Sequence, residues 1–134
     1  CQFLLADALD LPFADESFDA VTCAFALRNF ADIPRALGEF RRVLKPSGQV
    51  VILDLGRPVF LPFRVLYYLY FFGLVPLLGI LNRGALAAYS YLPRSLLSYP
   101  RQEHLAMLLE DVGFRSIEYE NLSGGIVAIH VAKR

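Results

Sequence analysis

Cysteine and net charge are both scarce in this chain. Two of its 134 residues are cysteine, Cys1 and Cys23, and 13 basic residues balance 13 acidic ones to a formal charge of zero. Two cysteines without ligand spacing exclude a disulfide framework and a cysteine metal site, and they are typical of a reducing compartment. Balanced charge gives no sign of a nucleic-acid partner. We therefore expect no metal, no nucleic acid and a cytoplasmic location.

Acidic residues are missing from a long central stretch. Between Asp54 and Glu103 the sequence has no Asp, Glu or Lys, whereas five arginines and six of the seven tyrosines lie there. Residues 59–81 carry one charge, Arg64, so a transmembrane helix has to be weighed. Prolines and glycines divide the run into pieces too short to span, and Arg64 would stand in hydrocarbon. We predict two shorter helices, which are either core or a cover over a binding site.

The first half of the chain has the pattern of alternating strands and helices, and the length suits one domain. Phe18–Ala24 and Gln49–Leu55 are short apolar runs, and the first predicts a strand buried on both faces. Between them a helix begins at the N-cap Asp32 and runs to about Leu44. This spacing predicts a βαβ unit with parallel strands. Gln2–Ala6 is a further candidate strand.

The second half ends in a different pattern. Lys45–Gly48 predicts a turn, and Pro100–Val112 predicts a helix that stops at Gly113. Phe114–Asn121 and Ile126–Lys133 then predict an antiparallel hairpin. A parallel sheet with an antiparallel end is therefore expected.

Polar side chains follow the predicted strands at their carboxyl ends. Arg28 and Asn29 come after the first run, and Asp54 lies near the end of the second. In open α/β sheets this edge is where ligands bind. Asp7 follows Gln2–Ala6 and, taken alone, is expected to cap a turn. We interpret both histidines, His104 and His130, as structural.

Several blocks match a known pattern: ADALDLPFADESFDAV, FALRNFADIPRAL, FRRVLKPSGQVVILDL, YSYLPRSLLSYP and GGIVAIHVAKR. Together they resemble the ubiquinone and menaquinone biosynthesis C-methyltransferases, which are class I S-adenosylmethionine-dependent methyltransferases. Leu27–Asn29 and Gly125–His130 are the narrower matches, and they favour the quinone branch. Ser47 stands where the family usually has glycine.

The resemblance implies an α/β fold: a Rossmann-like class I methyltransferase sheet, mostly parallel with an antiparallel carboxyl-terminal hairpin, and amino-terminally truncated. A Gly-rich cofactor loop would lie before Cys1. Residues 1–134 would form the carboxyl-terminal portion of a single domain, with a helical acceptor-covering insertion at about 57–99. The exposed strand edge of such a piece invites a second chain, so a homodimer is one expected assembly.

S-adenosylmethionine is the implied cofactor. Asp7 resembles the acidic residue that accepts a hydrogen bond from the adenine amino group, with the Ala8 backbone beside it. Phe25 and Ala26 would line the sulfonium. All of these positions follow from the resemblance.

The implied acceptor is a prenylated quinol in respiratory quinone biosynthesis. Arg28 and Asn29 would be the catalytic residues facing its ring, and Tyr89 and Tyr91 would close its pocket. The acid-free middle would meet an anionic membrane, which predicts a peripheral membrane association. Two alternatives stay open: a methyltransferase for another lipid or small molecule, and a truncated, non-catalytic remnant or interaction module.

Overall fold

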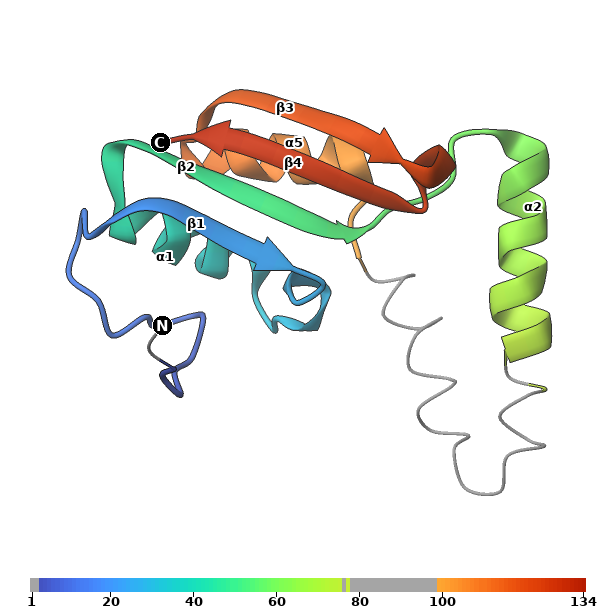
Figure 1. Ribbon diagram of the computed structural model, residues 1–134, viewed down its shortest axis with the longest axis horizontal. Coiled ribbons are helices and arrows are strands. Elements are labelled where there is room, and N and C mark those ends of the chain that lie inside the picture. The colour runs from blue at the N-terminus through green and yellow to red at the C-terminus, as the bar shows by residue number, and fades with distance from the viewer. Residues whose placement is uncertain (1–2, 76, 78–98) are drawn as a thin grey trace.

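The fold is built on one mixed sheet. The computed structural model describes residues 3–75, 77 and 99–134. Its four strands are hydrogen-bonded in the order β1-β2-β4-β3 (Figure 1). The β1–β2 pair is parallel, and the β2–β4 and β3–β4 pairs are antiparallel. The α/β class is confirmed, and within the described strands the sheet is mixed rather than mostly parallel.

The predicted βαβ unit is present. Strand β1 (Phe18–Ala24) leads through a single helical turn to helix α1 (Ile33–Val43), which returns the chain to strand β2 (Leu44–Leu55). The side chain of Asp32 accepts a hydrogen bond from the backbone N–H of Arg35 at 3.0 Å, which confirms the predicted N-cap.

Strand β2 begins earlier than the sequence indicates. Lys45–Gly48, predicted as a turn, belongs to β2, because Leu44 already pairs with Phe18. The register shifts between Phe18 and Ala20, so the extra residues of β2 are accommodated as an irregularity. A local turn signal was therefore overridden by pairing with a distant strand.

The carboxyl-terminal part matches its prediction closely. Helix α5 (Gln102–Val112) ends at Gly113, whose φ of 99° is the left-handed conformation that favours glycine. Strands β3 (Arg115–Leu122) and β4 (Val127–Lys133) form the expected antiparallel hairpin across the single helical turn η3 (Ser123–Gly125).

The hydrophobic core lies on one face of the sheet, where α1 and α5 pack (Figure 1). Strand β1 was predicted to be buried on both faces, and this is wrong: Cys23 is buried, whereas Ala20 and Ala24 are exposed. The reason is that no described element covers the opposite face. Side chains of the inner strands are only half-buried there: Val51, Leu53, Leu55, Val127, Ile129 and Val131.

The strand expected at Gln2–Ala6 is not formed over its described residues, 3–6. Phe3 and Leu5 are almost completely exposed. A strand needs the backbone groups of a neighbour, and among the described strands β1 is hydrogen-bonded only to β2. The apolar run therefore had the right composition but has no partner among the described strands.

Helix α2 (Leu61–Leu69) stands to one side of the sheet and continues into a π-helical turn, η2 (Tyr70–Leu74) (Figure 1). Pro62 lies in the first turn, as a helix start allows. Gly73 is one of the glycines that were expected to divide the run 59–81, but it lies inside η2. In the part of the chain that the structure describes, no helix is long and apolar enough to cross a membrane.

Candidate functional site

The turn after β1 carries Arg28 to the carboxyl edge of the sheet. Parallel pairing of β1 with β2 extends to Phe25, whose backbone N–H donates to Leu53 O at 2.8 Å. Phe25 has a positive φ of 54°, which turns the chain out of the strand. Leu27 is completely buried and anchors the short helix η1 (Leu27–Asn29) in the core. Arg28 is thus held between a strained turn and a core anchor.

Arg28 forms a buried ion pair with Asp54, at the end of β2. Its Nη1 donates to Asp54 Oδ1 at 2.5 Å, and its backbone N–H faces Oδ2 at 3.3 Å. The side chains of Arg28 and Asp54 are 12% and 1% exposed. The N–H of Leu55 also donates to Asp54 Oδ1, at 2.7 Å. The sequence predicted that these residues share an edge but not that they are paired.

One donor of the Arg28 guanidinium is left unsatisfied by the described residues. Arg28 Nε is buried without a hydrogen-bond partner among the described residues, and an orphaned donor of this kind is costly unless something accepts from it. The Phe25 ring lies against the same group, with its centroid 6.0 Å from Arg28 Cζ. Phe25 is itself 43% exposed. The edge therefore presents an aromatic surface beside a partly satisfied cation.

Two tyrosines that sequence reasoning did not select lie near this ion pair. The hydroxyl groups of Tyr67 and Tyr99 are buried without an acceptor or donor among the described residues. Burial raises the pKa of Tyr67 to about 12, and burial together with the charge of Asp54 raises the pKa of Tyr99 well above its usual range. Both phenols stay protonated at neutral pH and can donate hydrogen bonds. Their signal in the sequence was weak, because they stand among many tyrosines.

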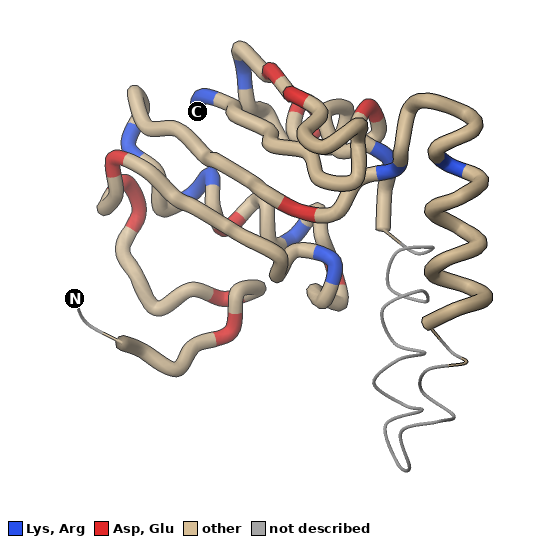
Figure 2. The backbone as a smooth tube through the Cα atoms, turned by 45° about the vertical axis from the view of Figure 1, so that its right-hand side comes forward, with Lys and Arg blue, Asp and Glu red and all other residues tan. Residues whose placement is uncertain are grey.

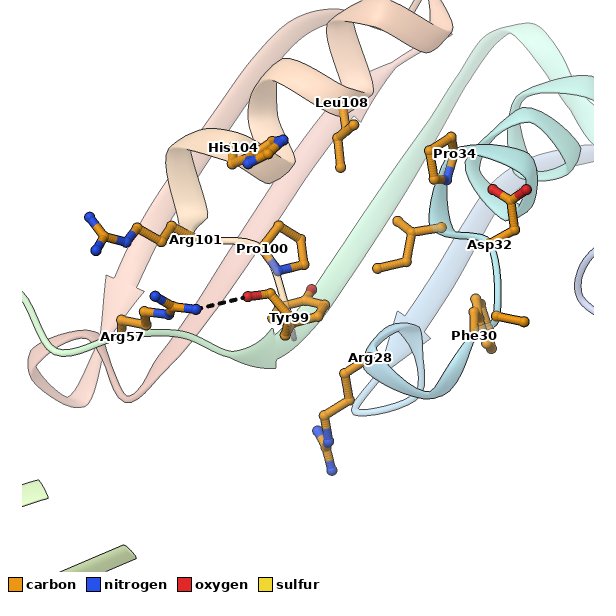
Figure 3. A pocket seen from close by; sticks show the side chains of 12 residues that line it. Arg28, Phe30, Asp32, Pro34, Arg57, Tyr99, Pro100, Arg101, His104 and Leu108 are labelled. Atoms are coloured by element: carbon orange, nitrogen blue, oxygen red, sulfur yellow. Dashed lines mark hydrogen bonds between the residues drawn. The ribbon is translucent and has the colours of Figure 1, made fainter. Parts of the chain in front are cut away.

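A cavity of about 690 Å³ opens next to Arg28, and we call it the Arg28 cavity (Figure 3). One wall comes from α5 and the residues before it, including Arg101 and His104, and the other from the start of α1. Arg57 reaches across from the loop after β2 and donates to Tyr99 O at 3.3 Å. Its lining residues are Arg28, Phe30, Ala31, Asp32, Ile33, Pro34, Arg57, Tyr99, Pro100, Arg101, His104 and Leu108. The mixed basic and aromatic lining suits a planar, oxygen-bearing ligand.

The structure brings four of the predicted site residues together. Phe25, Ala26, Arg28 and Asn29 share the turn after β1, where the backbone N–H of Asn29 donates to Ala26 O at 2.9 Å. Asn29 is exposed and Ala26 half-buried, so both can meet a ligand from solvent. This grouping agrees with a site at the carboxyl edge.

Asp7 and Ala8 lie in a separate turn, in which Asp7 is exposed and Ala8 is half-buried. Asp7 Oδ1 accepts a hydrogen bond from Leu9 N–H at 2.9 Å, which is the turn cap that the sequence predicted. The segment that follows is fastened to α1, because Arg35 Nε donates to Leu9 O at 3.1 Å. The role of Asp7 and Ala8 toward a cofactor stays a prediction.

The remaining candidates are a pair of tyrosines and two histidines. Tyr89 and Tyr91 lie outside the described residues. His130 is buried, with Nε2 3.0 Å from Gln102 O, and burial lowers its pKa. This contact supports its structural interpretation. His104 is exposed and lines the Arg28 cavity. Within the described ranges no cluster of His, Cys, Asp and Glu could hold a metal ion.

Comparison with known proteins places these features in a family. The sequence model of the ubiE/COQ5 methyltransferase family matches residues 1–134. A demethylmenaquinone methyltransferase of Thermus thermophilus is 48% identical over 133 residues, which are 99% of this chain and 60% of that protein. The ubiquinone/menaquinone biosynthesis C-methyltransferase UbiE of Haemophilus ducreyi is 41% identical, over 96% of this chain and 49% of its own length. The chain thus spans about half to three fifths of these relatives.

Solved structures agree on the fold. A SAM-dependent methyltransferase of Thermotoga maritima matches with a TM-score of 0.68 at 20% identity, over 97% of this chain and 62% of its own. Phosphoethanolamine N-methyltransferase 2 of Haemonchus contortus, solved with S-adenosyl-L-methionine, matches with a TM-score of 0.61 at 15% identity, over 96% and 36%. At these identities the likeness concerns the fold alone, and it is a Rossmann-like methyltransferase fold. With its whole length matched by one family, the chain belongs to the ubiE/COQ5 methyltransferases.

Proposed function

We propose that the protein containing this chain transfers a methyl group from S-adenosylmethionine to a ring carbon of a prenylated quinol, in respiratory quinone biosynthesis. The observation that carries the proposal is the Arg28–Asp54 pair, which holds a permanent cation beside an open cavity at the carboxyl edge. Membership of the family and the names of the relatives support this substrate class.

The residues present fit one side of the cofactor. Phe25 is an exposed aromatic ring, and aromatic faces attract a sulfonium as they attract other cations. Ala26 beside it is small, which leaves room for a bulky group. The exposed carboxylate of Asp7 is available to an adenine amino group, as the family resemblance implies. When bound, S-adenosylmethionine would supply an electrophilic methyl group.

Arg28 would act on the acceptor as a fixed positive charge. A quinol ring carbon becomes nucleophilic when a ring hydroxyl loses its proton, so the site must stabilise an oxyanion. Arginine is too basic to take that proton, but its fixed positive charge beside the cavity can stabilise the oxyanion, while water carries the proton away. The amide of Asn29 would hold the same oxygen or its neighbour. Asp54 positions the guanidinium through a short ion pair.

The prenyl tail of the acceptor requires an apolar path, and α2 offers one. A groove of about 470 Å³ on this helix is lined by Val65, Tyr68, Leu69, Phe72 and Gly73. Further apolar side chains of the same helix, Leu61 and Leu66, are exposed by 59% and 64%. Because the surrounding sequence lacks acidic residues, this surface suits an anionic bilayer. We infer a peripheral enzyme on the cytoplasmic side, and the closing of the acceptor's pocket by Tyr89 and Tyr91 stays a prediction.

A homodimer is part of the proposal. Among the described strands β1 is hydrogen-bonded to β2 alone, and an unpaired strand edge favours pairing with another chain. Light scattering of the natural protein tests this, since a monomeric mass at all concentrations would exclude a homodimer.

The decisive experiment separates turnover from cofactor affinity in the natural protein. For Arg28→Ala we expect turnover to fall by about 10²–10³-fold, since one oxyanion donor is worth ~2.7 to 4 kcal/mol in the transition state. The affinity for S-adenosylhomocysteine, measured by calorimetry, should change little. Arg28→Lys is the matched control, because it keeps the charge and loses the forked geometry. Asp7→Ala should show the reverse pattern, with weaker cofactor binding.

Two outcomes would overturn the assignment. Equal losses of turnover and cofactor affinity in Arg28→Ala would reject a role of Arg28 toward the acceptor. Wild-type protein that does not bind S-adenosylhomocysteine would favour a non-catalytic module. If the protein methylates a different lipid or small molecule but no quinol, the assignment as a methyltransferase stands and the quinol is rejected as its acceptor.

A further inference from the structure

A second cavity lies between the start of α2 and the start of α5. It measures about 370 Å³, and we call it the Arg64 cavity. Basic residues stand on both sides of this junction in Figure 2. Its lining residues are Arg57, Pro58, Val59, Arg64, Tyr68, Arg101, Gln102 and Glu103. It therefore adjoins the Arg28 cavity through Arg57 and Arg101, which line both.

The charges around the Arg64 cavity are unbalanced. The lining includes three arginines from different parts of the chain, Arg57, Arg64 and Arg101, and one carboxylate, Glu103. Gln102 does not contribute to a ligand site, because its amide group holds the fold together by donating to Arg57 O and Asn121 Oδ1 at 3.1 and 2.9 Å. Several positive charges that line one space favour an anion between them. The planar guanidinium group of arginine can donate two parallel hydrogen bonds to the oxygens of a phosphate.

Apolar residues adjoin the cavity on the side of α2. Val59 and Phe60, just before the helix, are both 67% exposed. The loop that carries them is held in place, because Val59 N–H donates to Gly124 O at 3.3 Å. The ligand is therefore expected to join a phosphate to hydrocarbon, which is the chemistry of a phospholipid.

We propose that Arg57, Arg64 and Arg101 bind the phosphate of a phospholipid headgroup, while Val59, Phe60 and α2 contact its acyl chains. This rests on the membrane contact proposed above and names the group that orients the enzyme on the bilayer. The acceptor cavity beside it would then open toward the membrane interior. A free phosphate compound has the same anionic chemistry, so the test must separate the two sources.

The test measures binding of the natural protein to sedimented vesicles. Phosphatidylglycerol vesicles carry phosphate, and digalactosyldiacylglycerol vesicles offer a bilayer without it. For Arg64→Gln/Arg101→Gln we expect affinity for phosphatidylglycerol to fall about 25-fold, since each arginine near an anionic surface contributes ~1 kcal/mol, which is about fivefold. Affinity for the galactolipid should stay unchanged.

Arg115→Gln is the matched control. Arg115 is exposed at the end of β3 away from η3, so its loss removes one arginine charge far from the cavity and is matched to each single variant, Arg64→Gln and Arg101→Gln. Far-UV circular dichroism and thermal midpoints establish that all variants fold alike. If the double variant binds phosphatidylglycerol as Arg115→Gln does, the phosphate site is rejected even though the membrane contact stands.

Two further arms separate this inference from the membrane contact itself. Leu66→Gln/Leu69→Gln should weaken binding to both kinds of vesicle, because it removes apolar contact and leaves the arginines. Inorganic phosphate should compete with phosphatidylglycerol only at high concentration. If wild-type protein ignores vesicles but inorganic phosphate raises its thermal midpoint, and the double variant loses that shift, the ligand is a free phosphate and the phospholipid assignment is wrong.

Discussion

At the scale of single residues, the proposed role of Arg28 depends on its ion pair with Asp54. A buried arginine without a carboxylate would be costly, and a buried carboxylate without a donor would be equally so. Asp54 balances the charge of Arg28 and also accepts a hydrogen bond from Leu55 N–H at 2.7 Å. The pair therefore fixes the direction of the guanidinium before any ligand arrives, and this preorganisation is what an oxyanion site needs.

We expect Asp54→Asn to destabilise the protein strongly. The change leaves Arg28 buried without its counter-charge, and breaking one partner of such a pair costs ~3 to 5 kcal/mol of unfolding free energy. Urea denaturation gives the measurement. Arg28→Met/Asp54→Asn is the control, because removing both charges should recover most of the loss. If Asp54→Asn is as stable as wild type, the Arg28–Asp54 pair does not contribute to the stability of the fold.

At the scale of elements, the start of α1 serves both the fold and the site. Its first turn and the residues before it form one wall of the Arg28 cavity. The helix is positioned by the Asp32 cap at one end and by buried Leu37 and Phe40 along its inner face. Fraying of the first turn of α1 would therefore change the wall of the Arg28 cavity while leaving the hydrophobic core largely intact.

Asp32→Ala should cost about 1 kcal/mol of unfolding free energy, since an N-cap side chain is worth ~0.5 to 2 kcal/mol. Asp32→Ser keeps an oxygen that can accept a hydrogen bond from Arg35 N–H. The unfolding free energy of this variant should therefore differ from that of wild type by only about a few tenths of a kcal/mol. Both values come from denaturant unfolding. Equal losses in the two variants would show that the charge, and not the cap hydrogen bond, is responsible.

At the scale of the whole molecule, a buried polar network joins the hairpin to α5 and the loop after β2. His130 on β4 contacts Gln102 O, and the Gln102 side chain reaches Arg57 O and Asn121. His130 also stacks on Tyr119, with ring centroids 5.3 Å apart. This network sets the position of Arg57, which lines both cavities.

Burial of His130 predicts a loss of stability in acid. Burial lowers the pKa of His130 below the 6.5 of an exposed histidine. As the pH falls below neutrality, His130 is therefore protonated in the unfolded chain but stays neutral in the folded chain. Stability is therefore present above that range and declines as the pH falls through it. Glu39, whose pKa the Arg42 hydrogen bond lowers to about 2, stays ionised throughout the range.

Urea unfolding at pH 8 and pH 5.5 checks this expectation. Wild type should lose unfolding free energy on acidification, and His130→Gln should lose less. If both proteins show the same dependence on pH, His130 is not the group that titrates.

Several elements, and the sheet edge that carries Arg28 and Asn29, were predictable from local patterns. The cap at Asp32, the stop at Gly113 and the closing hairpin depend on residues close in sequence, and all three are present. The carboxyl edge that carries Arg28 and Asn29 follows from parallel pairing alone. The tyrosines near the ion pair, Tyr67 and Tyr99, were not predictable, because their burial depends on how distant segments pack.

The sequence by itself determined the α/β class, the βαβ unit and the residues at its edge, since periodicity and capping are properties of short segments. Tertiary structure alone decided that Arg28 pairs with Asp54, that only one face of the sheet is covered by described helices, and that residues 3–6 form no strand. Each of these outcomes depends on which neighbours are within reach. Ion pairs, burial and strand pairing are made between segments far apart in the chain, and a pattern read along one segment does not contain its partner.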